Sequence, residues 1–455
     1  MSTEKNNDEE PNITPGEVVE DVLAQTFRAG RVFKASVVAL SILLALGIVG
    51  FVMRVSDGFS DHTAWGYYAA LFSFLLTTTQ SALIVSIAMR LARNNWRRPV
   101  SRASELFAVV GIFNLLVFIP MIMILPADEG RSSLWFEWPQ GGPHFWDTVS
   151  FATLVFCGIG LLYVSSLPDL AVIRDRSAGW RQTFAKILTP FWRGTQKQWL
   201  IMNIGLGVLG ALYFILLIFN HTMISSDMAM SLVPGWRDAL FPTYHAVTSL
   251  QAGLATVIVV LFVLKKYGGF DKYIHMEQFW AMSKLLLALS LMWFYFWFSG
   301  FIILWYGRQP IEQNILTLFM VGPYKSLFIA SFLLNFVVPV LMLIWNMVRK
   351  SIVGPTIVAG IILVGSLIDR IRIYVASYSI EDVFAHTMES VPAAHTPDIF
   401  DIFILIGGIS GAILVYILAA KVIPVVSIWE VKEGMLYTVV RPFLRRKVTV
   451  IGKPD

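Results

Sequence analysis

Long apolar runs separated by short polar connections dominate the chain from residue 34 to residue 426. Most runs reach about 20 residues, which is the length that an α-helix needs to cross the hydrocarbon core of a bilayer. The pattern therefore predicts an all-α polytopic membrane protein. We predict ten transmembrane helices, at 34–54, 67–90, 105–126, 147–167, 199–220, 242–264, 278–306, 327–348, 354–377 and 401–426.

Three regions follow from this pattern: an N-terminal tail (1–33), a transmembrane domain (34–426) and a C-terminal tail (427–455). The chain starts M-S-T-E-K-N-N-D-E-E-P-N, which is acidic and lacks the apolar core of a signal peptide. We expect this tail to be disordered. Loop lengths alone are compatible with two four-helix bundles, spans one to four and five to eight, plus two extra helices.

Basic residues are distributed very unevenly over the connections. The loops after even-numbered spans, together with the C-terminal tail, hold 22 Lys and Arg, whereas the opposite loops hold four. The positive-inside rule then places both termini in the cytoplasm and the poorly charged loops outside. Because this placement accounts for the net charge of +5, we expect no nucleic-acid partner.

Composition narrows the chemistry that the chain can carry. Hydrophobic residues make up 56% and charged residues 14%, against about 25% charged in soluble domains. The single cysteine, Cys157, lies in an apolar run and cannot supply the four thiolates that an iron–sulfur cluster typically takes. All seven histidines fall in loops or near span ends, so we expect no bis-histidine haem. No Walker A motif, metal-ligand spacing or nucleophile–base pattern is present.

The stretch G-S-L-I-D-R-I-R, from Gly365 to Arg372, places three charges late in the ninth span. Asp369 lies about 22 Å along that helix, in its outer half. Asp369 and Arg372 share a helix face and can pair, whereas Arg370 points elsewhere. Two interpretations remain open: the charges snorkel to the outer headgroups, or they form a polar site or proton relay inside the bundle.

Other polar residues belong to the same outer half. Asp147 opens the fourth span, and His221 and Asp227 lie in the predicted loop after the fifth. Each also has a plain interpretation as a helix cap or solvated loop residue. In the middle of the second span, Thr77 to Gln80 either bond a neighbouring helix or line a cavity. The aromatic outer loop Trp135 to Asp147 suits an interfacial belt or a docking surface.

An ordered set of short segments resembles a known family. The chain is similar to the NrfD/polysulfide-reductase membrane subunits, and most similar to the ten-span type of alternative complex III. The matching segments are N-N-W-R-R-P-V-S-R-A-S-E (94–105), F-W-D-T-V-S-F-A-T (145–153), L-P-D-L-A-V-I-R-D-R (167–176), N-H-T-M-I-S-S-D-M-A-M-S-L-V-P-G-W (220–236), F-P-T-Y (241–244), A-M-S-K-L (281–285), W-Y-G-R-Q-P-I-E-Q (305–313) and I-W-E-V-K-E (428–433).

The resemblance implies a multi-pass subunit of the bacterial cytoplasmic membrane that binds a quinol, menaquinol or ubiquinol, near the outer surface. Electrons would pass to an extrinsic iron–sulfur, molybdoenzyme-like subunit on the outer face. Further partners would be a haem c subunit and a second NrfD-like membrane subunit, and this chain itself would hold no haem or iron–sulfur cluster. Protons would leave by release or translocation.

The resemblance also assigns roles to particular residues. Asp147 would accept the quinol proton, and Thr79, Gln80, Met123 and Trp146 would line the quinone pocket with it. The proton path or pocket would include His221, Asp227, Asp369 and Arg370.

This sequence departs from the family pattern at three places. T-T-T-Q-S-A-L around Thr79 replaces a histidine-containing motif, Met123 stands near the place of a second histidine, and Gly300 replaces a polar residue. A quinol needs a base within hydrogen-bond reach when it is oxidised. One alternative is therefore a scaffold subunit with a degenerate quinone pocket. A secondary transporter is a third possibility and ranks last, because polar mid-span content is modest.

Overall fold

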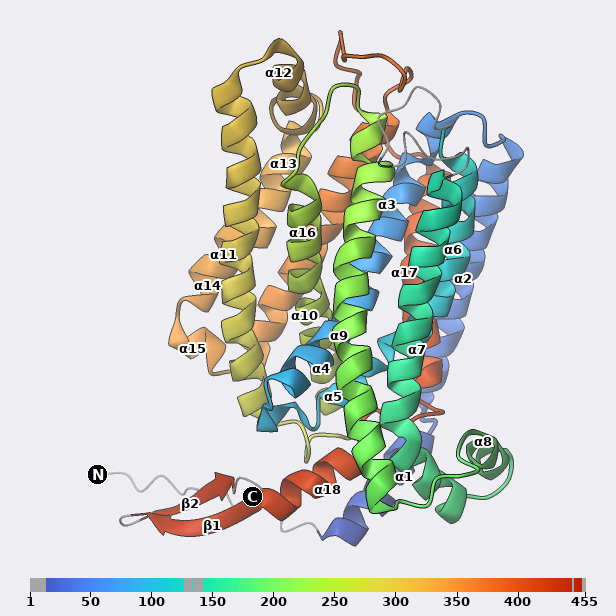
Figure 1. Cartoon of the computed structure of the whole chain (residues 1–455), viewed down its shortest axis with the longest axis vertical. Helices are drawn as coiled ribbons and strands as arrows, with labels where there is room; N and C mark the ends of the chain where they lie inside the picture. The colour runs from blue at the N-terminus through green and yellow to red at the C-terminus, as the bar shows by residue number, and fades with distance from the viewer. Residues whose placement is uncertain (1–13, 127–133, 135–141, 444–445, 452–455) are drawn as a thin grey trace.

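The computed structural model describes residues 14–126, 134, 142–443 and 446–451. Its helices run side by side along the long axis of the molecule (Figure 1). Most of the aromatic loop at 135–147 lies outside the described residues. The secondary structure is, in chain order, α1 (Pro15–Phe27), α2 (Arg31–Ser56), η1 (His62–Trp65), α3 (Gly66–Leu75), η2 (Leu76–Gln80), α4 (Ser81–Leu91), η3 (Asn95–Arg97), α5 (Ser101–Glu105), α6 (Phe107–Ile124), α7 (Gly142–Arg176), α8 (Trp180–Leu188), α9 (Gln196–Asp227), η4 (Met230–Leu232), α10 (Phe241–Tyr267), α11 (Met276–Gly307), α12 (Pro310–Leu316), η5 (Thr317–Val321), α13 (Lys325–Phe332), η6 (Leu333–Val337), α14 (Val338–Leu343), α15 (Asn346–Arg349), α16 (Val353–Tyr378), α17 (Ile399–Ala419), α18 (Ile428–Tyr437) and an antiparallel hairpin of β1 (Thr438–Phe443) and β2 (Arg446–Ile451).

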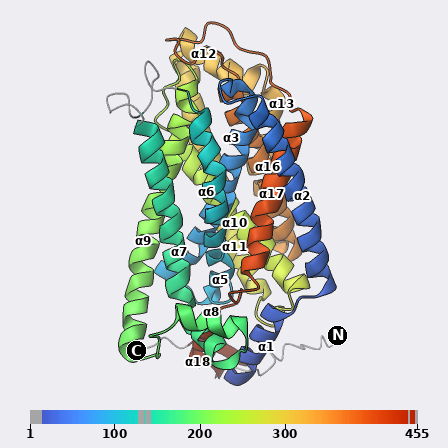
Figure 2. The same ribbon diagram turned by 90° about the vertical axis from the view of Figure 1, so that its right-hand side faces the viewer.

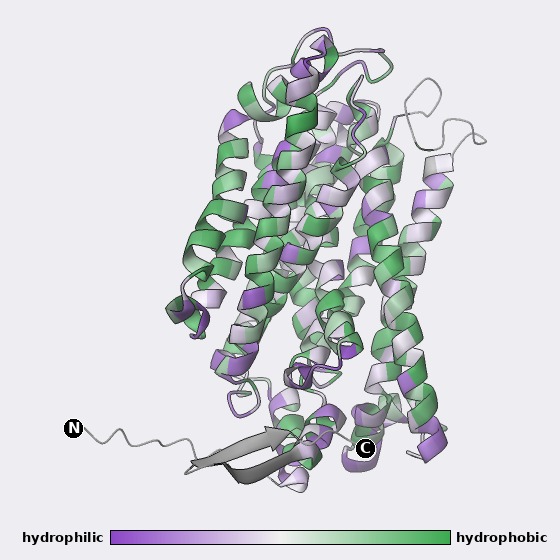
Figure 3. Cartoon of the chain, turned by 60° about the vertical axis from the view of Figure 1, so that its left-hand side comes forward, coloured by the Kyte–Doolittle hydropathy of each residue, from purple (hydrophilic) through white to green (hydrophobic). Residues whose placement is uncertain are grey.

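The prediction of an all-α polytopic membrane protein is confirmed. Among the described residues, nine helical segments are long and apolar enough to cross a membrane. Hydrophobic residues extend along these helices, and hydrophilic residues are concentrated toward the two ends of the bundle (Figure 3). The ninth predicted span, 354–377, corresponds to α16, a 26-residue helix that carries the three late charges and is not among these nine segments. Each predicted span therefore corresponds to a helix or to a short series of consecutive helices.

The two ends of the bundle differ in what covers them. Helices α1, α8 and α18 lie together at one end, which we call the basic end, and α12 lies at the other, which we call the α12 end (Figures 1 and 2). Helix α8 has an apolar edge, because Trp180, Phe184 and Ile187 are all exposed. That amphipathic pattern is typical of a helix lying in the membrane interface.

Part of the N-terminal tail is helical, so the expectation of disorder was wrong from Pro15 onward. Thr14 and Glu17 form a capping box: the Glu17 carboxylate accepts from the Thr14 N–H at 2.7 Å, and Thr14 Oγ1 accepts from the Glu17 N–H. Val18 and Val22 of α1 are fully buried. We expected the entropy cost of ordering this acidic segment to keep it disordered. Capping and burial together offset that cost.

The predicted division into spans one to four and spans five to eight is wrong. The second span, α3/η2/α4, contacts α6 and α9 but also α10 and α16. Helices α2 and α17, the first and last spans, pack mainly on each other (Figure 2). Glycines allow this approach, since a Cβ on Gly47 would lie 2.5 Å from the Gly407 Cα atom. Small residues at helix contacts are a common way to pack helices in membranes.

Helix α10 lies equally close to α4. A Cβ on Gly253 would lie 2.5 Å from the carbonyl carbon of Ser81, a distance that real Cβ atoms do not show. Gly360 of α16 has nothing within 4 Å of such a Cβ. We expect Gly253→Ala to destabilise the protein by about 1–3 kcal/mol through overpacking. Gly360→Ala should be neutral or stabilising, because alanine favours helix by about 1 kcal/mol. Thermal unfolding of both variants in detergent checks this, and equal midpoints would contradict it.

A buried ion cluster ties the basic end together. Glu105 of α5 bonds Arg90 at 2.7 Å and Arg102 at 3.3 Å, and Arg102 also bonds Asp169 of α7 at 3.2 Å. Glu430 of α18 accepts from Arg90 at 2.9 Å. Three of the segments that carry the family resemblance, 94–105, 167–176 and 428–433, thus meet in one place. Buried charges of this kind are retained in membrane bundles where they are mutually paired.

Candidate functional site

Two histidines from neighbouring helices meet inside the bundle, toward the α12 end. His221 lies in α9 and His245 in α10, and neither side chain is exposed. Their Nδ1 atoms are 2.9 Å apart. The prediction that His221 lies in a loop was wrong, because α9 continues to Asp227. The contact makes a continuous polar element in an otherwise apolar interior.

Hydroxyl groups continue the chain on both sides of the histidine pair. Ser81 Oγ lies 3.3 Å from His221 Nε2. On the other side, Ser73 Oγ and the Tyr374 hydroxyl each lie 3.1 Å from His245 Nε2. All four helices that contribute, α3/η2/α4, α9, α10 and α16, are thereby joined. We call Ser81, His221, His245, Ser73 and Tyr374 the histidine chain.

The histidine chain has two equivalent arrangements of its protons. A neutral imidazole carries a proton on one nitrogen and accepts on the other. If His245 Nδ1 donates to His221, His245 Nε2 accepts from Tyr374 and His221 Nε2 donates to Ser81. If His221 Nδ1 donates instead, every one of these bonds reverses. One proton entering at one end and one leaving at the other converts the first arrangement into the second.

The charges of α16 are buried inside the bundle, so the interpretation of snorkelling headgroup anchors was wrong. Arg372 Nη2 donates to Asp369 Oδ1 at 2.7 Å, as the three-residue spacing predicted. Tyr244 donates to the second carboxylate oxygen at 2.9 Å. The exposed fractions of the two charged side chains are 5% and 2%.

Arg370 points to another partner. One of its terminal nitrogens donates to Thr248 Oγ1, and Thr248 in turn donates to the His245 carbonyl at 2.9 Å. The Nε and Nη1 atoms have no hydrogen-bond partner among the described residues. Arg370 is fully buried. The structure thus separates Arg370 from the Asp369–Arg372 pair and places it against the helix turn that carries His245.

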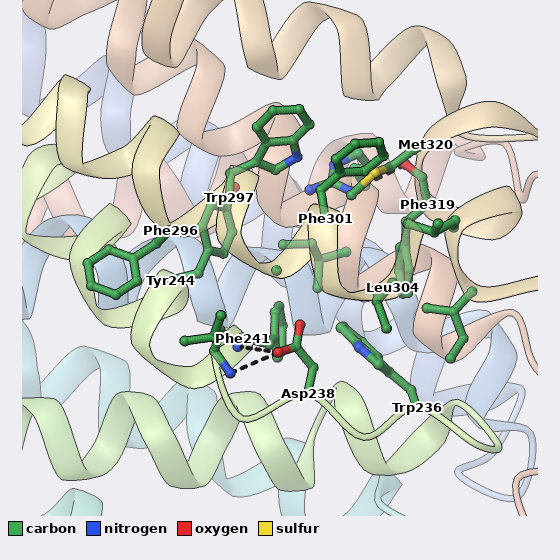
Figure 4. A pocket seen from close by; sticks show the side chains of 16 residues that line it. Trp236, Asp238, Phe241, Tyr244, Phe296, Trp297, Phe301, Leu304, Phe319 and Met320 are labelled. Atoms are coloured by element: carbon green, nitrogen blue, oxygen red, sulfur yellow. Dashed lines mark hydrogen bonds between the residues drawn. The ribbon is translucent and has the colours of Figure 1, made fainter. Parts of the chain in front are cut away.

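A small cavity of about 60 Å³ lies next to the arginine of the Asp369–Arg372 pair. Figure 4 shows the side chains that line this cavity. Its lining includes Tyr244, Arg372, Asp238 and Gly300. Burial raises the pKa of the Asp238 carboxyl, while the N–H groups of Leu240 and Phe241 that bond it act in the opposite direction. A Cβ on Gly300 would lie 3.4 Å from Asp238 Oδ2. A carboxylate from the α9–α10 connection therefore lies where the resemblance leads us to expect a polar residue on α11. The volume is enough for a few water molecules.

The predicted proton acceptor Asp147 lies in the second turn of α7, since that helix starts at Gly142. It is therefore not a helix cap, and its side chain is fully buried. Ser150, one turn further, exchanges hydrogen bonds with Asn220, the neighbour of His221. Asp227, also fully buried, accepts from the Leu134 N–H at 3.1 Å. Asp147 therefore lies one turn from the Ser150–Asn220 contact between α7 and α9, whereas His221 contacts Ser81 of α4 and His245 of α10.

Thr79 and Gln80 belong to a different level of the bundle. They lie in η2, a π-helical turn in the middle of the second span. Asn114 of α6 donates to Thr79 Oγ1 at 2.7 Å, and Tyr213 of α9 donates to the Gln80 carbonyl at 2.9 Å. The interpretation of helix–helix hydrogen bonding thus holds for these two residues, and Thr79 also lines a cavity, as the alternative interpretation expected. Single π-helical turns are often associated with functional sites.

Aromatic rings occupy the space between these levels. Phe72, Phe118 and Phe151, from α3, α6 and α7, have ring centroids 5.1 to 5.4 Å apart and are fully buried. Met123 is 58% exposed on the outside of α6, and Trp146 is 38% exposed on α7. The residues assigned to the quinone pocket therefore lie at three places: η2, the outside of α6, and the start of α7.

A second polar stretch follows α4 toward the basic end. Ser86 donates to Glu105 at 2.6 Å, and Glu105 belongs to the buried ion cluster. Ser86 and Ser81 are five residues apart on α4, a rise of about 7.5 Å. Polar groups thus run from the basic end through Glu105 to Ser86, and again from Ser81 to Tyr374.

Sequence reasoning missed His245, Tyr374 and the two serines. His245 directly follows the segment F-P-T-Y, but its place near a span end led us to discount it. In comparisons with known proteins, no family model matched the chain and no curated protein matched it.

Proposed function

We propose that the chain is a proton-conducting membrane subunit of a quinol-oxidising respiratory complex. The observation that carries the proposal is the histidine chain, in which two buried imidazoles bond each other and hydroxyl groups at both ends. Ionisable residues inside a membrane bundle are costly and usually functional. Histidine is the side chain best suited to exchange protons near neutral pH.

The path that we propose has two parts. From the basic end, which we propose faces the cytoplasm, it follows Glu105 and Ser86. It then continues to Ser81, about 7.5 Å further along α4. From Ser81 it follows His221 and His245 to Tyr374. Protons would leave at the α12 end, where Asp147 and Asp227 also lie.

The place of this path in an electron-transfer complex rests on the family resemblance. In this proposal quinol binds near Asp147, whose carboxylate accepts a proton as electrons pass to an iron–sulfur partner on the outer face. The Ser150–Asn220 bonds support it, because they connect the Asp147 turn of α7 to the His221 turn of α9. In this proposal Asp147 and His221 pass protons in sequence.

Asp147→Asn should abolish quinol oxidation while leaving the complex assembled. Asparagine keeps the size and the hydrogen-bonding shape but cannot take the proton, and general base catalysis contributes about 10²–10⁴-fold. The measurement is quinol oxidation by the complex purified through a tag on this chain. Asp61→Asn is the matched control, since Asp61 caps η1 on the same side. Turnover that equals the unmodified complex would refute the role of Asp147.

A scaffold subunit is the second candidate, and the phenylalanine cluster favours it. Phe72, Phe118 and Phe151 fill the interior between η2 and Asp147. A scaffold would purify with iron-containing partners, yet the complex would keep its activity in the Asp147→Asn and histidine variants. A secondary transporter would purify without such partners. An iron assay on the tagged preparation, together with the quinol assay, separates the three.

A further inference from the structure

A large cavity lies at the basic end and has no part in the proposed path. Its volume is about 800 Å³, within the range of about 300–1,000 Å³ for ligand sites. The connection between α1 and α2 forms its rim, and α10 and α17 form its walls. Its deep end reaches Phe74, Thr78 and Thr79 of the second span.

The depth of this cavity matches one leaflet of a bilayer. Along α17 and its C-cap the lining extends from Ile409 to Ala420, and along α10 it extends from Thr256 to Tyr267. Each interval of 11 residues corresponds to about 16 Å of helix. One leaflet contributes about 15 Å, half of the hydrocarbon core. An acyl chain that enters from the basic end would therefore fit along the walls as far as the bilayer centre.

The deep end offers few polar groups to a ligand. Thr78 and Thr79 donate to carbonyls of their own helix, both at 2.7 Å. Apolar side chains such as Phe107, Val260 and Ile413 dominate the lining. A polar ring system would lose hydrogen bonds to water here without regaining them, which is costly. The deep end thus suits a hydrocarbon chain.

The rim is cationic. Arg28, Arg31 and Lys421 belong to the lining, and none of the described lining residues is acidic. Arg28 and Arg31 are exposed, and neither has an ion-pair partner in the part of the chain that the structure describes. Lys421 donates to the Arg28 carbonyl at 2.9 Å, which fixes its ammonium group at the rim. Arg181 adds a further cation, stacked on the Phe27 ring at 4.1 Å.

We propose that this cavity binds an anionic phospholipid, with its phosphate among Arg28, Arg31 and Lys421 and an acyl chain between α10 and α17. Basic pockets between transmembrane helices on the cytoplasmic side are suited to anionic headgroups. Burial and the nearby Arg181 lower the pKa of Lys421, and an anion would offset both effects. The site is independent of the histidine chain.

The test uses the full chain purified in mild detergent, with lipid identified and counted by native mass spectrometry. We expect about one anionic phospholipid per chain. Reversing the rim with Arg28→Glu and Arg31→Glu should reduce its occupancy at least about tenfold. Ala412→Trp, which fills the cavity without changing charge, should do the same. Retention of the lipid in both variants would overturn the proposal.

Two matched controls separate the site from general effects. Arg193→Glu with Lys197→Glu reverses two exposed charges at the same end, and Ile406→Trp adds the same ring on the exposed face of α17. Both should keep the lipid. Adding phosphatidylglycerol to delipidated protein should raise its unfolding temperature more than phosphatidylcholine does. An unmodified protein that carries quinone, a zwitterionic lipid, a bound polypeptide or nothing in this cavity would overturn the proposal.

Discussion

Replacing His245 with glutamine should stop proton transfer through the histidine chain and leave the protein folded. Glutamine can still bond Ser73, Tyr374 and His221, but its amide cannot take up a proton at one atom and release it at another. Since a positioned proton carrier contributes about 10²–10⁴-fold, we expect proton translocation to fall at least about 100-fold. The measurement is protons released per electron by the purified complex in proteoliposomes with a pH-sensitive dye.

The control for this variant is His62→Gln. His62 lies in η1, outside the histidine chain, and bonds the Ile380 carbonyl at 2.7 Å. It should keep the ratio of protons to electrons of the unmodified complex. His221→Gln should behave like His245→Gln, because either imidazole interrupts the same relay. If both variants kept the proton-to-electron ratio of the unmodified complex, the histidine chain would be a structural contact only. That result would favour the scaffold function.

The transmembrane helices could be predicted because hydrophobic length alone specifies them. Their ends could not, since helices continue past the apolar run wherever polar residues find partners inside the protein. Helix α9 shows this: the run ends near Asn220, but the helix reaches Asp227, and His221 and Asp227 are buried. A rule that ends a span at the first polar residues therefore moved two site residues into a loop.

Local pairs could also be predicted, whereas contacts between helices could not. The Asp369–Arg372 bond follows from a spacing of three residues within one helix. The capping box of Thr14 and Glu17 has an equally local signature, T-P-G-E, which the acidic composition of the tail obscured. The bond between His221 and His245 depends on how closely α9 approaches α10, and a single sequence carries no direct signal for that.

The same limit explains the wrong division into bundles. Loop lengths show which helices are consecutive but not which ones pack together. The pairing of α2 with α17 depends on glycines such as Gly47 and Gly407, which are more than 300 residues apart. Small residues in apolar runs were visible in the sequence, but their partners were not.

Replacing Asp369 with asparagine should produce the largest loss of stability of any single change considered. The side chain accepts from Arg372 with one oxygen and from Tyr244 with the other. Removing its charge leaves the Arg372 guanidinium buried without a counter-ion, and breaking a buried pair costs about 3–5 kcal/mol. Thermal and denaturant unfolding in detergent would measure this.

Asp401→Asn is a demanding control, because it removes an equally buried carboxylate that also pairs with an arginine. Arg54 bonds Asp401 at 2.8 Å, but it bonds Asp398 at 2.7 Å as well. The arginine therefore keeps a counter-ion in this variant, and we expect a clearly smaller loss. Equal losses in the two variants would show that an unpaired guanidinium is not the cause.

The double variant Asp369→Leu with Arg372→Met tests whether the Asp369–Arg372 pair serves stability or proton transfer. Apolar replacement of a whole buried ion pair is often neutral or stabilising, so we expect most of the lost stability to return. The histidine chain does not include Asp369. Proton release per electron in the double variant should therefore stay within about twofold of the unmodified complex. This is a much smaller change than the loss expected for His245→Gln. Recovered stability with lost proton release would instead assign Asp369 to the proton path, as the family resemblance implies. Because the single variant tests the charge and the double variant tests the carboxylate itself, the two together separate the stability of α16 from the chemistry that it positions.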